Sequence, residues 1–95
     1  MCLGVINPIY DLIYKYSQWA NFDWLWMYFD RKGVIRFYDY EEKQPTSLTK
    51  VLRSIFDNGM LDECFSEHEL EVFFDYVPDE FKMEINYYLE ELNEN

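Results

Sequence analysis

The sequence predicts an α+β fold in which a two-stranded antiparallel hairpin is packed among helices, in the order α-β-β-α-α-α. Three observations lead to this prediction. Apolar residues recur at helical spacing in four segments, two β-prone runs flank a short polar turn, and capping residues precede three of the helical segments. A chain of 95 residues is expected to form one domain, residues 1–95.

The first helix is expected from Pro8 to Trp19. Asn7 can accept a backbone N–H as the N-cap, and Pro8 follows at the first helical position, where its missing N–H is not needed. The apolar stripe of this helix has i, i+3, i+4, i+7 spacing and consists of Ile9, Leu12, Ile13 and Tyr16.

Residues 24–29 and 34–40 are rich in aromatic and β-branched side chains, and they flank a polar turn that ends in Gly33. This pattern is typical of a β-hairpin, in which Gly33 can adopt the positive φ of a tight loop. Alternation along the strands defines two faces. The expected core lining consists of Leu25, Met27, Phe29, Ile35 and Phe37. The opposite, aromatic face consists of Trp24, Trp26, Tyr28, Arg36, Tyr38 and Tyr40.

The aromatic face has a functional and a structural interpretation. Trp, Tyr and Arg dominate protein–protein contacts, so the face is an alternative partner or dimer surface. Equally, helices could cover both faces of a hairpin in a small domain. Because a lone hairpin is marginally stable, either the helices cover it or a second copy of the chain extends the sheet. Stacking on bases ranks last, because the chain is acidic.

Residues 41–45 are expected to form a polar loop, after which Thr46 or Ser47 can cap a second helix. That helix is expected to end at Asn58, because Gly59 can take the left-handed conformation just beyond a helix. Its apolar stripe consists of Leu48, Val51, Leu52 and Ile55.

Residues 61–95 are expected to contain two further helices after a link of ambiguous structure at residues 60–65. Ser66 and Glu69 match a capping box, and Pro78 separates the two helices because proline disfavours a helical conformation in the preceding residue. The two apolar stripes consist of Leu70, Phe73, Phe74 and Val77, and of Phe81, Ile85, Tyr88, Leu89 and Leu92.

Negative charge is concentrated in this acidic helical part, residues 61–95. It holds twelve of the nineteen carboxylates and one strong base, Lys82, which gives a net charge of −11. Residues 1–60 contain seven acids and seven bases. This charge disfavours nucleic acid or an anionic membrane as a direct ligand and favours a basic protein partner. The alternative is that the acids only keep the chain soluble.

Six carboxylates are expected on the outer side of the last two helices, and they are the candidate partner-binding residues. Carboxylates four residues apart on a helix lie about 6 Å from each other. Phosphates along a DNA strand have a broadly similar spacing. The rows would therefore resemble a nucleic-acid backbone, and they consist of Glu67, Glu71, Asp75, Glu80, Glu84 and Glu91.

No catalytic or metal-binding motif is evident. His68 is the single histidine, and although Cys64 precedes it by four residues, a cap at Ser66 would interrupt the helix between them. We therefore expect no enzyme activity, cofactor or metal site. Cys2 and Cys64 are expected to be reduced thiols, and without a signal peptide or a membrane span the protein is expected to be cytoplasmic.

In size, charge and aromatic content, this chain resembles the small acidic inhibitors that phages encode, which include anti-CRISPR and anti-restriction proteins that mimic DNA. The resemblance covers the whole chain by composition and residues 61–95 by charge pattern, and no family motif carries it. It implies that the chain occupies and blocks the basic nucleic-acid channel of an enzyme, such as a CRISPR effector or nuclease, in the host cytoplasm.

Two alternatives to this inhibitor hypothesis remain. An immunity or antitoxin-type protein would neutralise a basic toxin through the same carboxylates. An interaction or dimerisation module would instead use the aromatic face of the hairpin.

Overall fold

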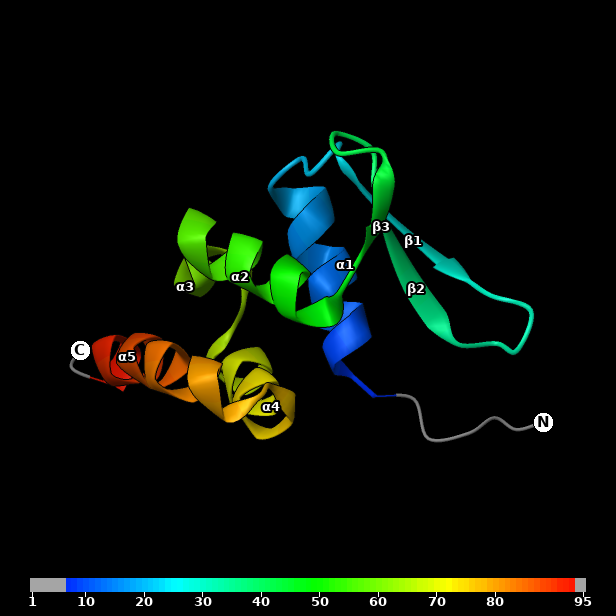
Figure 1. Ribbon diagram of the computed structural model, residues 1–95. Coiled ribbons are helices and arrows are strands. Elements are labelled where there is room, and N and C mark those ends of the chain that lie inside the picture. Colours follow the sequence, from blue (N-terminus) through cyan, green and yellow to red (C-terminus); the bar gives the residue numbers. More distant parts are fainter. Residues whose placement is uncertain (1–6, 94–95) are drawn as a thin grey trace. The chain divides into compact units, whose positions relative to one another are not determined.

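The computed structural model describes residues 7–93 and confirms the α+β fold (Figure 1). The helices are α1 (Ile9–Trp19), α2 (Leu48–Asn58), α3 (Leu61–Cys64), α4 (Glu67–Tyr76), the 3₁₀ helix η1 (Asp79–Phe81) and α5 (Lys82–Asn93). The strands are β1 (Leu25–Phe29), β2 (Ile35–Asp39) and β3 (Gln44–Thr46).

The described residues form two compact units, and the boundary between them lies within α1. Unit 1 comprises residues 7–15 and 60–93, and unit 2 comprises residues 16–59. The single domain expected from the chain length stays a prediction.

The first two helices begin and end where their capping residues predict. The backbone N–H of Ile9 donates to Oδ1 of Asn7 at 3.0 Å, and the N–H of Lys50 donates to Oγ of Ser47 at 3.2 Å. Gly59 follows α2 with a φ of 79°, a conformation that a residue with a Cβ adopts only under strain.

The link between α2 and α4 contains the short helix α3, which the sequence left ambiguous. Phe65 is extended, and α4 then starts with the predicted capping box: Oγ of Ser66 accepts the N–H of Glu69, and the Glu69 carboxylate accepts the N–H of Ser66. Two hydrogen bonds thus satisfy N–H groups that a helix start leaves unpaired. Val77 ends α4, and Pro78 precedes η1, as the sequence indicated.

Strand β2 is the centre of an antiparallel sheet with the order β1-β2-β3 (Figure 1). Met27 lies opposite Phe37, and Trp26 lies opposite Tyr38, so the predicted division into two faces is confirmed. Phe37 is buried, but the expectation that Phe29 lines the core is wrong: its side chain is 71% exposed. Phe29 is the last residue of β1, next to the hairpin turn, and pairs there with Ile35 alone.

The prediction of a two-stranded sheet is also wrong, because β3 adds a third strand, and the polar loop predicted at residues 41–45 is confined to residues 41–43. Proline argues against a strand, but at an edge its missing N–H faces away from the neighbour and costs nothing. Oδ1 of Asp39 accepts the N–H groups of Glu41 and Glu42 at 2.8 and 3.0 Å, which returns the chain toward β2.

Asp30 organises the turn between β1 and β2. Its carboxylate accepts the N–H groups of Lys32 and Val34 at 2.8 and 2.9 Å and forms an ion pair with Arg36 at 2.9 Å. The hydrogen bond from Val34, followed by that from Arg36, holds the pKa of Asp30 below its ordinary 3.8. Gly33 has the predicted positive φ, 79°.

Each unit has buried apolar residues. In unit 1 they are Ile9, Leu12, Ile13, Leu61, Cys64, Phe65, Leu70, Phe73, Val77, Phe81 and Ile85. In unit 2 they are Tyr16, Phe37, Val51, Leu52, Ile55 and Phe56. Tyr88, Leu89 and Leu92 of the predicted last stripe are half-buried.

Tyr16 combines full burial with a polar group that the core must satisfy. Its hydroxyl donates to the carbonyl of Gly59 at 2.6 Å and accepts Nδ2 of Asn58 at 2.7 Å. Its ring packs against Trp19 and Phe22, with centroids 5.5 Å away in both cases. Tyr16 thereby ties α1 to the end of α2 within unit 2.

We expect Tyr16→Phe to lower the free energy of unfolding by about 1–3 kcal/mol, because it leaves the carbonyl of Gly59 without that donor. Urea denaturation followed by circular dichroism measures the loss. Tyr40→Phe, which removes a hydroxyl from an exposed ring, is the control and should change stability by less than about 0.5 kcal/mol. Equal losses in the two variants would contradict the role of the Tyr16 hydroxyl.

Candidate functional site

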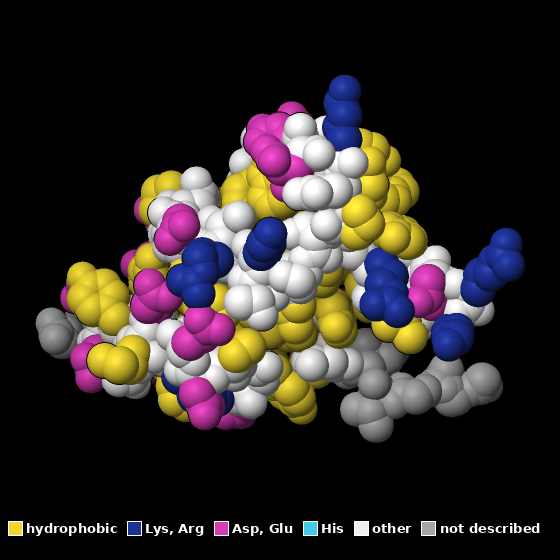
Figure 2. Space-filling model, in the orientation of Figure 1, with side chains coloured by type: hydrophobic (Ala, Val, Ile, Leu, Met, Phe, Trp, Pro, Cys, Tyr) yellow, Lys and Arg dark blue, Asp and Glu magenta, His cyan; other side chains and the backbone are white. Residues whose placement is uncertain are grey.

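The six predicted partner-binding carboxylates are all exposed and all belong to unit 1. We call them the acidic surface. Three lie on successive turns of α4, one lies in η1 and two lie in α5, in the order Glu67, Glu71, Asp75, Glu80, Glu84 and Glu91. Helices α4 and α5 pack against each other. Over them, Figure 2 shows Asp and Glu side chains with hydrophobic side chains between them.

The division into two units coincides with the division of charge. The described part of unit 1 has twelve carboxylates and two amino groups, Lys15 and Lys82, a net charge of −10. Unit 2 has six carboxylates and six Lys or Arg residues, a net charge of zero. The negative charge of the chain is therefore a property of one compact unit. Glu94 lies outside the described residues.

The two cations of unit 1 lie at opposite ends of α4. Nζ of Lys15 contacts both carboxylate oxygens of Glu69, the capping-box residue, at 2.8 Å. Nζ of Lys82 donates to the carbonyl of Phe74 at 2.6 Å, in the last turn of α4, and lies 4.7 Å from the centroid of its ring. A cation is favourable at that end of a helix because it satisfies a terminal carbonyl and complements the helix dipole.

Glu69 differs from the carboxylates of the acidic surface. The hydrogen bond from Lys15, followed by that from the N–H of Ser66, lowers the pKa of Glu69 from its ordinary 4.5. Its stabilising effect is therefore present above pH 4.5 and is lost as the pH falls through the lower folded-state pKa. Glu69 has a structural role at the start of α4, which leaves the remaining carboxylates of α4 directed to solvent.

Helix α5 carries its charge against its own dipole. Its last turn contains Glu90 and Glu91 and no basic residue, although a helix C-terminus favours cations. Each such carboxylate costs about 0.3–1 kcal/mol. Local stability therefore does not explain the distribution of acids on α5.

Sequence reasoning missed two exposed apolar residues on α5. Met83 is 84% exposed and Tyr87 is 59% exposed, four residues apart on α5. The hydroxyl of Tyr87 donates to the carboxylate of Glu91, and this hydrogen bond raises the pKa of Tyr87. Their four-residue spacing outside the buried stripe of α5 was the signal that could have found them.

In unit 2, four of the six predicted aromatic-face residues lie together. Trp26, Tyr28, Tyr38 and Tyr40 line an open depression of about 320 Å³, which we call the aromatic patch. The ring centroids of Tyr38 and Tyr40 are 5.1 Å apart, and those of Trp26 and Tyr40 are 6.5 Å apart. Trp26 and Tyr40 are more than half exposed. The patch is therefore accessible as a contact surface.

The other two predicted members of that face, Trp24 and Arg36, do not line the patch. The Trp24 ring packs 5.2 Å from Phe22, because Trp24 precedes β1 and does not follow the strand alternation. The guanidinium of Arg36 is paired with Asp30 at the hairpin turn. Figure 2 shows that Lys and Arg side chains gather around this turn, where Arg31 and Lys32 are also exposed.

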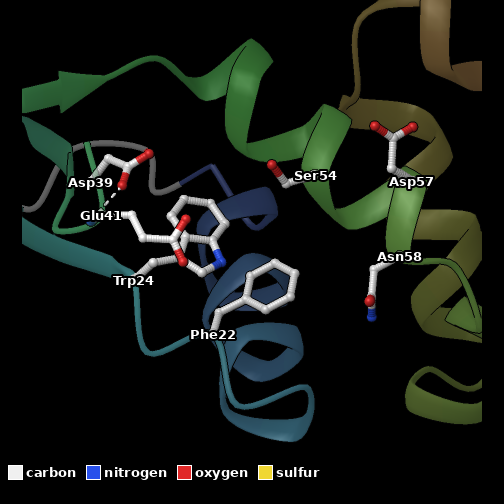
Figure 3. A pocket seen from close by; sticks show the side chains of 7 residues that line it. All are labelled: Phe22, Trp24, Asp39, Glu41, Ser54, Asp57 and Asn58. Carbon is white, nitrogen blue, oxygen red and sulfur yellow. Dashed lines mark hydrogen bonds between the residues drawn. The ribbon is translucent and has the colours of Figure 1, made fainter.

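Trp24 lines a pocket of unit 2 that sequence reasoning also missed (Figure 3). The pocket is open, with a volume of about 470 Å³, and its lining comes from the segment before β1, the end of β2 with its loop, and α2. It consists of Phe22, Trp24, Asp39, Glu41, Ser54, Asp57 and Asn58. The carboxylate of Asp39 is occupied by the N–H groups of the adjacent turn, one of which is drawn in Figure 3. Residues so far apart in sequence show no common pattern before folding.

The helix break that the sequence predicted between Cys64 and His68 is present. Cys64 is buried in α3, and burial raises the pKa of its thiol. His68 is exposed in the first turn of α4, and the extended Phe65 with the cap Ser66 separates it from Cys64, as predicted. No group of three or more His, Cys, Asp or Glu residues in this range could hold a metal ion. Cys2 lies outside the described residues.

Within residues 7–93, no helix has the length and apolar character that crossing a membrane requires. Comparisons with known protein families, curated proteins and solved structures find no match for this chain. The acidic surface and the aromatic patch are therefore the features from which a function can be inferred.

Replacement of Lys82 tests whether its amino group stabilises the end of α4. We expect Lys82→Met, which keeps most of the apolar stem, to lower the free energy of unfolding by about 1–2 kcal/mol through loss of a charged hydrogen bond and a cation–π contact. Lys50→Met, at an exposed position of α2, is the matched control and should have little effect. Chemical denaturation in which both variants match the wild type would show that Lys82 has no such role.

Proposed function

We propose that this chain is a non-enzymatic inhibitor whose acidic surface binds the basic nucleic-acid-binding site of an enzyme, such as a CRISPR effector or a nuclease. The observation that carries the proposal is the net charge of −10 on unit 1 beside the neutrality of unit 2. Carboxylates added for solubility alone have no reason to be confined to one unit. A surface for a basic partner requires that confinement.

The arrangement of the carboxylates supports a site that normally holds a nucleic acid. Glu67, Glu71 and Asp75 follow one another at four-residue intervals on α4, with a spacing of about 6 Å. A basic channel that binds phosphates at similar intervals could bind this row in their place. The cations of unit 1 do not neutralise the row, because Lys15 binds Glu69 and Lys82 binds a carbonyl.

Met83 and Tyr87 support a protein as the partner. Long-range attraction between carboxylates and Lys or Arg accelerates the association of two proteins. The lifetime of their complex depends on close contacts from which water is excluded. An exposed Met and Tyr among carboxylates can supply those contacts. A purely solvated surface would not need them.

The aromatic patch supports a second candidate, an interaction module of unit 2. Aromatic side chains such as Trp26 and Tyr40 are typical of protein–protein contacts and here are more than half exposed. In that case the carboxylates of unit 1 would not contact the partner. The two candidates use different units and can be separated by mutation.

Charge reversal is the experiment that separates them. The immobilised chain is used to isolate basic nucleic-acid-binding enzymes from bacterial lysate, and each enzyme is assayed for DNA binding by gel shift with the chain as competitor. We expect the wild type and Trp26→Ala to displace DNA, and the triple variant Glu67→Lys, Glu71→Lys, Glu84→Lys to lose at least about tenfold in potency. Met83→Ala with Tyr87→Ala should weaken inhibition without changing the net charge.

Circular dichroism verifies that each variant is folded. Inhibition that survives the triple reversal would contradict the proposal. If Trp26→Ala alone abolished it, the second candidate would replace the first.

A further inference from the structure

The open pocket of unit 2 is separate from the acidic surface, because every residue that lines it belongs to residues 16–59. Its volume is about 470 Å³. Pockets that bind small molecules usually have volumes of about 300–1,000 Å³. Three segments supply the lining, namely α2, the end of β2 with its loop, and the segment before β1 (Figure 3). The size of the pocket therefore suits a small ligand.

Two aromatic rings form the apolar part of the pocket. The ring centroids of Phe22 and Trp24 are 5.2 Å apart, and both side chains are half-buried. Phe22 also packs edge to face against the fully buried Tyr16, and its carbonyl accepts the N–H of Leu25 at 3.2 Å. The position of the Phe22–Trp24 pair is thus fixed within unit 2. It presents an apolar surface that a ligand need not order on binding.

The ionisable groups that line this pocket are all carboxylates, those of Asp39, Glu41 and Asp57. Oδ1 of Asp39 accepts two N–H groups of its own turn. The carboxylates of Glu41 and Asp57 form no hydrogen bond or ion pair with another group in residues 7–93. Asp39 and Glu41 lie on one side of the Phe22 ring in Figure 3, and Asp57 lies on the other side, on α2. Negative charge therefore flanks the aromatic surface on two sides.

An adjoining depression of about 380 Å³ shares Trp24 with the pocket and has a different charge. Its lining adds two cations, Lys50 and Arg53, and a further carboxylate, Glu42. The pocket and the depression together have four carboxylates and two cations, a net charge of −2. Because both cations line the adjoining depression alone, a positively charged ligand is favoured in the pocket that contains Phe22.

The separation of the carboxylates distinguishes an organic cation from a metal ion. A metal ion needs several ligand atoms that converge on one point. In residues 7–93, no group of three or more His, Cys, Asp or Glu residues could hold such an ion. A metal ion would also make no use of the Phe22–Trp24 surface. The pocket instead suits positive charges that are separated by an apolar segment.

We propose that this pocket binds an aliphatic polyamine, with ammonium groups directed to Glu41 and to Asp57 and with methylene groups across the Phe22–Trp24 surface. Carboxylates and the faces of aromatic rings both attract ammonium groups. The methylene groups gain free energy when they leave water at the rings. A ligand with a single ammonium group, such as the Lys side chain of a partner protein, would satisfy one side of the pocket alone.

Calorimetric titration of the full chain with spermidine, in buffer of about 0.15 M salt, tests this proposal. We expect the double variant Glu41→Gln, Asp57→Asn to raise the dissociation constant by about fivefold, because it removes both carboxylates that contact ammonium groups. The matched control is Asp62→Asn, Glu63→Gln, at two exposed positions of α3 in unit 1. It removes the same amount of charge and should change the dissociation constant by less than about twofold.

The aromatic surface is tested separately. Trp24→Leu should raise the dissociation constant by about two- to fivefold, through loss of a cation–π contact. In the wild type, spermidine should shift the NMR signal of the indole N–H of Trp24, a readout that does not require the variant to fold. Mg²⁺ at the same ionic strength should not cause this shift, because it has charge and no methylene groups.

Circular dichroism verifies the folding of each variant. Equal losses of affinity in the two double variants would overturn the proposal, since general attraction to an acidic chain would then explain the binding. An unchanged Trp24 signal would overturn it as well, because spermidine would then lie elsewhere. Nα-acetyl-lysine amide represents the Lys side chain of a partner protein. If it bound as tightly as spermidine, one ammonium group would suffice and the proposed polyamine would be wrong.

Discussion

Repulsion among the carboxylates of unit 1 is the constraint to which the rest of this unit is adapted. Like charges four residues apart on a helix cost a few tenths of a kcal/mol for each pair. Full burial of one Leu, Ile or Phe side chain contributes about 1.5–3 kcal/mol. The fully buried Leu70, Phe73 and Ile85 therefore outweigh several repulsive pairs, so α4 and α5 can carry the charge. The two cations of the unit lie at the ends of α4, where Lys15 donates to Glu69 and Lys82 donates to a backbone carbonyl. Neither cation therefore neutralises the six carboxylates of the acidic surface. The outer side of the helices keeps its negative charge.

Local signals in the sequence were sufficient to predict the main helices. Asn7, Ser47 and Ser66 cap helices where expected because each signal depends on the next two or three residues alone. The hairpin faces were also predictable, since alternation is a property of the strand itself. Strand β3 was missed because Pro45 argues against a strand unless its edge position is known. Trp24 was assigned to the wrong face because strand alternation was extended one residue before β1 begins.

A candidate site could be predicted from the sequence when its residues lie close together along the chain. The acidic surface follows from charge and helical period along one continuous segment, and all six of its residues are exposed as expected. Met83 and Tyr87 were missed because their exposure depends on which stripe α5 buries. The pocket of Phe22, Trp24 and Asp57 joins three segments of unit 2, and their proximity depends on tertiary structure. The boundaries of the two compact units likewise became visible only in the fold.

The central claim is that the charge of unit 1 binds a basic partner. Its most direct test is the salt dependence of the dissociation constant for an enzyme that the chain inhibits, measured by calorimetry from about 50 to about 300 mM salt. If the carboxylates replace phosphates in a basic channel, the affinity should fall steeply and linearly on a double-logarithmic plot. An affinity that stays constant over this range would contradict the account, because contacts that do not depend on charge would then hold the complex.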